Sequence, residues 1–349
     1  MKALRFYDIQ DLRYEEADDP VITAPDEVIV KVKAVGICGS DIARYRSLGP
    51  YIKGNVWGHE FAGEVVETGA EVTTVKAGDR VVGCPNLVCH TCEYCTSGHP
   101  SRCETLNTIG ALVPGAFAEY IKMPAKNLVH MVEGMTFEEG ALTEPTTVAI
   151  HGLYQSHIQM GYEVAVVGCG NIGLMSIAWS KAFGAKRVFA LDVDDGQLEM
   201  AKSFGADMCI NTKDADFHEA IRQYGPGVDL AIESAGNPFT AARVLGLPHK
   251  GGEVVYMGIP YGDVPVPRFY FERIMRNELE IHGSWCTISA PYPGREWANA
   301  VDYIGNHKVR VTQMITHQRN MSEGPELFRQ IIDNPRGFGK VLLYPEENR

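Results

Sequence analysis

The chain of 349 residues is 45% hydrophobic and carries a formal net charge of -12 at pH 7. This length accommodates two domains with well-buried cores, and the composition excludes a disordered chain. The acidic balance argues against a nucleic-acid or acidic-membrane partner, and no stretch is long and apolar enough to span a bilayer, so we expect a cytoplasmic protein.

Short strands and turns are predicted from the start of the chain to about residue 150. Valines alternate with lysines over residues 28–33, which is the period-two pattern of a strand with one buried face. Residues 63–82 then place apolar side chains and turn glycines at hairpin spacing. This part of the sequence predicts a compact, mostly β domain.

Short apolar runs alternate with helical patterns from about residue 155, which is typical of a parallel doubly wound sheet. We expect six strands, over residues 163–167, 188–192, 208–210, 228–233, 253–257 and 279–282. The tail predicts helices over 296–306 and 325–332 and a strand over 340–344, and it is too short to form its own domain. We therefore expect one domain from residues 1–153 with 286–349, and a second from residues 154–285.

A glycine-rich turn follows the first of these six strands. Its residues are Gly168, Cys169, Gly170, Asn171, Ile172 and Gly173, which fit G-x-G-x-x-G. Alone this pattern is weak, but here a strand precedes it, a helix follows it, and the next strand ends in Asp192 about twenty residues on. This context predicts a dinucleotide site, with the pyrophosphate at the helix N-terminus and Asp192 at the ribose hydroxyls.

Asp192 also predicts which dinucleotide binds. A carboxylate accepts hydrogen bonds from a free 2′-hydroxyl and repels a 2′-phosphate, and the next residues add acid instead of an arginine. NAD is therefore favoured over NADP.

Four cysteines crowd into one short segment, at Cys89, Cys92, Cys95 and Cys103. Four thiolates close a tetrahedral zinc site and leave no open position, which is typical of a structural site that fixes a loop. A redox or iron–sulfur centre is compatible with the same spacing.

A second set of chemically capable residues is dispersed along the chain. Cys38 lies in Gly-Ile-Cys-Gly-Ser40-Asp41, His59 lies beside Glu60, and Glu144 precedes a proline. Each alone is explained as well by a buried cysteine, a core histidine or a surface acid.

In combination and in this order, these motifs resemble those of the zinc-dependent medium-chain dehydrogenases, over essentially the whole chain. Glu144, His282-Gly283-Ser284-Trp285 and the segment 289–297 are similar to the polyol branch, and within it to galactitol-1-phosphate dehydrogenases. The resemblance implies an α/β fold class, with a GroES-like, mostly β catalytic domain plus a Rossmann doubly wound parallel sheet. It also implies two zinc ions per chain, NAD, and a homodimer or homotetramer pairing near residues 279–285.

The resemblance also implies roles for the dispersed residues. Cys38, His59 and Glu144 bind the catalytic zinc, Glu60 is an exchangeable ligand, Asp41 orients His59, and Ser40 takes the proton of the substrate hydroxyl. A site with one thiolate, one imidazole and one carboxylate also suits Mn or Co. The family's histidine shortly after the cysteine motif is missing here, so the proton route stays open between Ser40 with the cofactor ribose and water, and Glu60.

The resemblance points to oxidation of a polyol or polyol phosphate. A phosphate group needs cations, and the candidates are Arg44, Arg46, Lys53 and Arg295, which are equally explained as surface residues. The open alternatives are an unphosphorylated substrate such as sorbitol, butanediol or threonine, and a non-catalytic NAD-binding protein. A zinc-bearing nucleic-acid module is disfavoured by the acidic charge.

Overall fold

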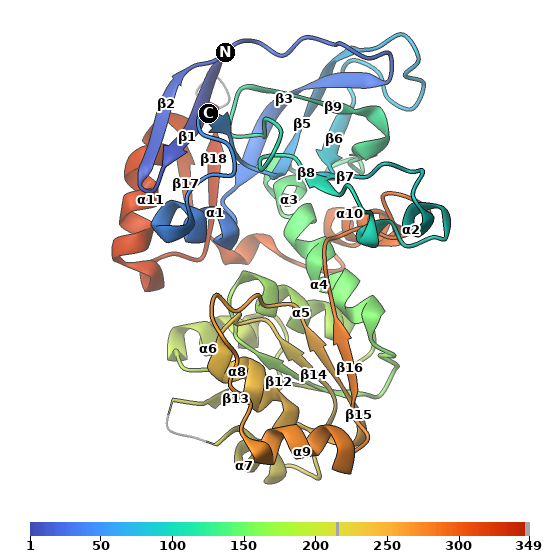
Figure 1. Ribbon diagram of the computed structural model, residues 1–349, viewed down its shortest axis with the longest axis vertical. Helices are drawn as coiled ribbons and strands as arrows, with labels where there is room; N and C mark the ends of the chain where they lie inside the picture. Colours follow the sequence, from blue (N-terminus) through green and yellow to red (C-terminus); the bar gives the residue numbers. More distant parts are fainter. Residues whose placement is uncertain (214–215, 346–349) are drawn as a thin grey trace. The chain divides into compact units, whose positions relative to one another are not determined.

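The computed structural model describes residues 1–213 and 216–345 (Figure 1). The chain forms two compact units, Met1–Thr147 with Thr287–Arg349, and Val148–Cys286. The first change of unit comes six residues before the predicted one, because helix α4 (Thr143–Gln155) runs across it. No helix among the described residues is both long and apolar enough to cross a bilayer.

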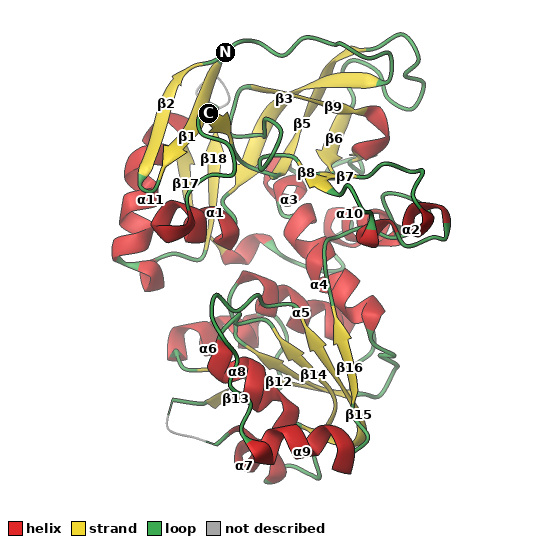
Figure 2. Cartoon of the chain, in the orientation of Figure 1, coloured by secondary structure: helices red, strands yellow, loops and turns green. Residues whose placement is uncertain are grey.

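The first unit is built largely from strands (Figure 2). Its main sheet has the order β10-β6-β5-β3-β18-β17, with β9 also paired to β3. The members are β3 (Glu27–Gly36), β5 (Glu60–Thr68), β6 (Arg80–Gly83), β9 (Tyr120–Pro124), β10 (Leu128–His130), β17 (Ile315–Asn320) and β18 (Lys340–Tyr344). Smaller sheets join β2 (Asp11–Glu16), β1 (Lys2–Asp8) and β4 (Asn55–Val56), and β7 (Asn86–Leu87) and β8 (Asn107–Thr108).

The C-terminal segment of the chain returns to this first unit. β18 pairs antiparallel with β3, and Leu343 lies opposite Val35. The valines of β3 are buried on a core that includes Phe6, Trp57 and Phe328. The helices of the first unit are α1 (Gly39–Ala43), α2 (Glu93–Thr96), α3 (Phe137–Ala141), α10 (Arg295–Gly305) and α11 (Gly324–Asp333).

The second unit is a six-stranded parallel sheet, as predicted, with the order β13-β12-β11-β14-β15-β16. The strands are β11 (Glu163–Val167), β12 (Arg187–Asp192), β13 (Met208–Asn211), β14 (Val228–Glu233), β15 (Pro248–Tyr256) and β16 (Glu280–Gly283). The helices are α5 (Asn171–Ala182), α6 (Asp195–Ser203), α7 (Phe217–Arg222), α8 (Pro238–Arg243) and α9 (Arg268–Arg276). The apolar runs of the central strands are buried, as parallel sheets require. The predicted α/β fold class is confirmed.

Candidate active site and zinc centres

The pairing of β3 with β5 brings Cys38 and His59 together. Gly36, at the end of β3, lies opposite Glu60, the first residue of β5. Cys38 therefore follows one strand at the point where His59 precedes the other. Ligand atoms of Cys38, His59 and Glu60 all lie within 4.8 Å of one another.

Asp41 is fixed beside this group by the helix that follows Cys38. The backbone N–H of Cys38 donates to Asp41 Oδ2 at 3.0 Å, so Asp41 caps the first turn of α1. Asp41 Oδ1 lies 3.9 Å from His59 Nδ1, which is within ion-pair range and too long for a hydrogen bond. Burial raises the pKa of Asp41 to about 6. Ser40, on the same helix, is exposed.

His59 sits among negative groups. Its burial alone would lower its pKa, but Cys38, Asp41 and Glu144 outweigh that effect and hold the pKa well above the ordinary value. An imidazole in such surroundings attracts a proton or a metal ion.

Glu60 forms a buried ion pair with Lys340, a residue for which the sequence analysis predicts no role. Lys340 Nζ contacts Glu60 Oε2 and donates to the backbone oxygen of Ile37 at 3.2 Å. The two side chains are 1% and 2% exposed. Gly36 makes room for the pair, because a Cβ there would collide with the Glu60 carboxylate. The sign of a buried lysine in the sequence is that Lys340 directly precedes the apolar residues 341–343.

Glu144 lies in the first turn of α4 and is buried. Burial raises its pKa to about 7, and His59 is the largest opposing influence, so the two groups are electrostatic neighbours. Within the described residues, the cluster of ligand atoms inside 4.8 Å contains Glu60 and not Glu144. The predicted set of Cys38, His59 and Glu144 is therefore gathered in part.

The charge balance of this region fits a divalent cation. Three carboxylates, Asp41, Glu60 and Glu144, are at least nine-tenths buried. Lys340 neutralises one of them. Buried anions are costly unless they are paired or bind a metal, and a thiolate, an imidazole and a carboxylate are the donor types of a catalytic zinc site.

The four-cysteine loop has the dimensions of a tetrahedral zinc site. Cys89 Sγ lies 3.6 Å from Cys103 Sγ and 4.0 Å from Cys95 Sγ, far beyond disulfide length, and all four cysteines are free. A zinc–sulfur distance of about 2.3 Å gives tetrahedral sulfur–sulfur separations of about 3.8 Å. The N–H groups of Thr91 and Cys92 lower the pKa of Cys89 to about 5, which favours the thiolate.

The glycine turn joins β11 to α5 where the strand order of the second sheet reverses, the usual position of a dinucleotide in such sheets. Gly168 has φ +88°, and a Cβ there would lie 2.8 Å from the backbone of Ala235. A side chain at Gly173 would collide with the Gly168 carbonyl. At Gly170, by contrast, a Cβ would meet nothing within 4 Å, so this side of the turn is open to a ligand.

Asp192 ends β12 and contacts this turn directly. Its Oδ2 accepts from the Cys169 N–H at 2.7 Å, and its Oδ1 accepts from the Asp194 N–H at 3.0 Å. A carboxylate has about four acceptor positions, so two remain for ribose hydroxyls. Asn171 and Ile172 begin α5 and are half-buried.

The four candidate substrate cations differ in their surroundings. Arg44 lies 3.3 Å from the centre of the Tyr51 ring and donates to the Gly49 carbonyl at 3.0 Å. Lys53 forms an exposed ion pair with Asp8 at 2.5 Å. Arg46 and Arg295 are exposed.

Known protein families match both units. An alcohol dehydrogenase GroES-like domain matches residues 24–133, and a zinc-binding dehydrogenase matches residues 171–304. A ribosomal protein L11 methyltransferase also matches, over residues 108–218. Galactitol 1-phosphate 5-dehydrogenase of Escherichia coli (strain K12) is 34% identical over 96% of this chain and 97% of that protein. The chain belongs to the zinc-dependent medium-chain dehydrogenase family.

Other members are similar over the same length. Sorbitol dehydrogenase of Bacillus subtilis (strain 168) is 33% identical over 99% of this chain and 97% of that protein. The crystal structure of E. coli galactitol-1-phosphate dehydrogenase superposes with a TM-score of 0.95 at 32% identity, covering 99% of this chain and all of that one. A zinc-binding dehydrogenase of Sinorhizobium meliloti 1021, crystallised with NADP, has a TM-score of 0.89 at 31% identity, with 99% of each chain covered.

The chain is thus an NAD-dependent zinc alcohol or polyol dehydrogenase, and its cysteine cluster and Cys38–His59 site fit a structural and a catalytic zinc.

Replacing Asp41 by alanine is expected to weaken zinc binding at the Cys38–His59 site roughly 10- to 100-fold, because a carboxylate beside a ligating imidazole generally orients the ring. Competition with a fluorescent chelator measures the affinity. Asp41→Asn is the control, since its amide oxygen still accepts from the Cys38 N–H. If both variants bind zinc as the wild type does, Asp41 serves only to cap α1.

Proposed function

We propose that the dehydrogenase oxidises a secondary hydroxyl of a polyol phosphate similar to galactitol 1-phosphate, with NAD as the hydride acceptor. The observation that carries this proposal is the full-length likeness to galactitol-1-phosphate dehydrogenase in both sequence and structure. The motif residues of the polyol branch, from Glu144 to the segment 282–297, support the same assignment.

In this proposal Cys38, His59 and Glu144 hold the catalytic zinc. Glu60 stays paired with Lys340 and can exchange with a zinc ligand or a water molecule. Bound zinc supplies a Lewis acid that lowers the pKa of an alcohol into the neutral range. Asp41 keeps the His59 ring in position from a distance of 3.9 Å. Ser40, exposed two residues after Cys38, accepts the proton of the substrate hydroxyl and passes it to solvent.

A free polyol is the second candidate substrate, because sorbitol dehydrogenase is almost as similar to this chain as the polyol-phosphate enzyme. Initial rates of NAD reduction with galactitol 1-phosphate, galactitol and sorbitol distinguish the two. We expect kcat/KM to be at least tenfold greater for the phosphorylated substrate, because one charge-assisted hydrogen bond contributes about 1.5–3 kcal/mol. Equal or greater values for the free polyols would overturn the proposal.

Arg46 is a better candidate for phosphate recognition than Arg44 and Lys53, because it is exposed and those two contact Tyr51 and Asp8. Arg295 is tested with it. Substituting each cation by alanine should raise KM for galactitol 1-phosphate and leave KM for sorbitol unchanged wherever the cation binds phosphate. The Lys53→Ala variant provides the comparison for a cation engaged elsewhere.

Asp192→Ala is expected to lower kcat/KM for NAD about 10- to 100-fold and kcat/KM for NADP much less. Only NAD has a free 2′-hydroxyl that donates a hydrogen bond to this carboxylate. Steady-state kinetics with both dinucleotides measure the ratio. Asp195→Ala, in the first turn of α6, is the matched acidic control. An unchanged ratio in Asp192→Ala would show that the carboxylate only stabilises the glycine turn through Cys169.

We also propose that the enzyme is a homodimer or homotetramer whose copies pair along β16. This strand is an edge of the second sheet, and Ile281 and Trp285 are large, exposed apolar side chains on and next to it. Analytical ultracentrifugation of wild type and Ile281→Lys tests this pairing, and a monomeric wild type would contradict it.

A further inference from the structure

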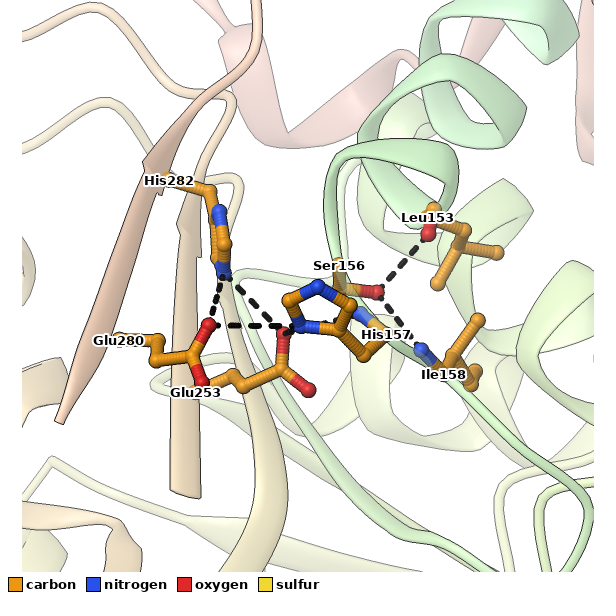
Figure 3. A network of polar contacts seen from close by, with 7 residues as sticks. All are labelled: Leu153, Ser156, His157, Ile158, Glu253, Glu280 and His282. Carbon is orange, nitrogen blue, oxygen red and sulfur yellow. Dashed lines mark hydrogen bonds and ion pairs between the residues drawn. The ribbon is translucent and has the colours of Figure 1, made fainter. Parts of the chain in front are cut away.

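A cluster of two histidines and two glutamates lies in the second unit, and it shares no residue with the two zinc centres described above. His157 follows α4, Glu253 lies on β15, and Glu280 and His282 lie on β16. Figure 3 shows the four side chains converging, with the two imidazoles and the two carboxylates facing one another.

Strand register brings three of the four together. β15 and β16 are parallel neighbours, and Glu253 is the partner of Glu280. His282 is two residues beyond Glu280, so both side chains leave β16 on the same face of the sheet. The fourth member is held by a turn, in which the Ser156 hydroxyl donates to the Leu153 carbonyl at 2.8 Å and accepts from the Ile158 N–H at 3.3 Å (Figure 3).

The separations of the side-chain atoms match the edges of a small coordination polyhedron. His157 Nδ1 lies 3.3 Å from Glu253 Oε2 and 3.4 Å from Glu280 Oε2. His282 Nε2 lies 3.1 Å and 3.9 Å from the same two oxygens. Ligands about 2.0–2.1 Å from a tetrahedral zinc are about 3.3 Å from one another. All four atoms lie within 4.8 Å of one another, a grouping that could hold a metal ion.

The net negative charge of the cluster also favours binding of a cation. With neutral imidazoles the two carboxylates carry two negative charges, and the Glu253 side chain is only 5% exposed. The backbone N–H of His157 donates to Glu253 Oε2 at 2.9 Å, which satisfies only part of that carboxylate. Two neutral imidazoles have one N–H each to offer, so a divalent ion would balance the carboxylates more fully than hydrogen bonds do.

We propose that His157, Glu253, Glu280 and His282 form a third metal site, which takes a divalent transition ion, with zinc the first choice. Two imidazole nitrogens and two carboxylate oxygens are zinc ligands, and four protein ligands leave no open position. The role is therefore structural, linking the loop after α4 to the edge strand β16 and its neighbour β15. His157 and Glu280 are 63% and 57% exposed, which gives the ion a path from solvent.

The number of zinc ions retained per chain after dialysis against a series of buffered free-zinc concentrations tests the site. Inductively coupled plasma mass spectrometry should find one ion fewer per chain in His157→Ala and in His282→Ala than in the wild type, or an affinity for that ion lowered at least tenfold. His157 is mostly exposed, so its variant should fold normally. Zinc should also raise the thermal midpoint of the wild type more than that of His157→Ala.

His307→Ala is the matched control, because His307 is 65% exposed and lies 3.3 Å from a single carboxylate, that of Glu139. This variant should retain the full number of ions. Equal zinc content in the wild type and both cluster variants would overturn the proposal and show that the four side chains only contact one another. A loss in His307→Ala equal to that in His157→Ala would overturn it too, because binding would then reflect any exposed histidine. Dehydrogenase activity is recorded separately and does not decide the outcome.

Discussion

Lys340→Met is expected to lower the free energy of unfolding of the first unit by about 3–5 kcal/mol, because it leaves the buried Glu60 carboxylate without its cation. Both partners are almost fully buried, and Gly36 gives the pair its space. Urea unfolding followed by near-UV circular dichroism measures the change. Since the chain has two units, the transition of the first unit must be resolved separately.

Two further variants make the Lys340 result interpretable. Lys308→Met breaks an exposed pair with Asp302 at 2.8 Å and should cost less than about 1 kcal/mol. The double variant Lys340→Met with Glu60→Gln removes both charges and should recover much of the lost stability. If Lys340→Met costs no more than Lys308→Met, the buried pair does not stabilise the unit.

Glu144→Gln is expected to release the catalytic zinc and to lower kcat roughly a thousandfold, since the Lewis acid supplies several kcal/mol of stabilisation to the reaction. Glutamine keeps the size of the side chain and removes only the charge. Zinc content and the rate of NAD reduction are measured on the same samples. Glu60→Gln is the control, and it should retain zinc because the Glu60 charge is already paired with Lys340.

The zinc affinity of this site should also depend on pH in a way that isolates Glu144. Burial raises the pKa of this carboxyl from 4.5 to about 7, so below about pH 7 the metal-free folded protein favours the protonated form. Zinc must displace that proton, so the Glu144 contribution to affinity rises up to about pH 7 and is constant above. His59, whose pKa is also raised, adds a pH dependence that the wild type and Glu144→Gln share. In the metal-free protein, the contribution of Glu144 to stability is lost as pH rises from about 4.5 to about 7, because the folded chain holds the proton and the unfolded chain does not. Glu144→Gln should show a shallower dependence, and an identical one would exclude Glu144 as the group responsible.

The elements whose signals are local could be predicted from the sequence. The glycine turn at 168–173, the strand ending in Asp192 and the four-cysteine loop are each encoded within a short segment. The six strands of the second sheet are predicted by their apolar runs, and the structure places β11 and β14 at the predicted residues. In the first unit, β18 also lies at the predicted residues. β15 begins five residues earlier than predicted, because its first half lacks an apolar run.

Features that depend on pairing between distant strands could not be predicted. The Glu60–Lys340 pair requires β18 to lie beside β3, which brings together residues 280 positions apart. The cluster in the second unit requires the register of β15 against β16, and nothing local fixes that register. The gathering of Cys38, His59 and Glu144 was inferred from family resemblance, and the structure adds that Glu60 lies closer to the first two.

Anomalous diffraction at the zinc absorption edge, from crystals of the zinc-loaded dehydrogenase, locates the catalytic zinc and identifies its ligands. We predict an anomalous peak coordinated by Cys38, His59 and Glu144, with Glu60 still paired to Lys340, in addition to the peak among the four cysteines. A structure without zinc at Cys38 and His59, or with Glu60 as the permanent ligand and Lys340 displaced, would show that this ligand set is wrong.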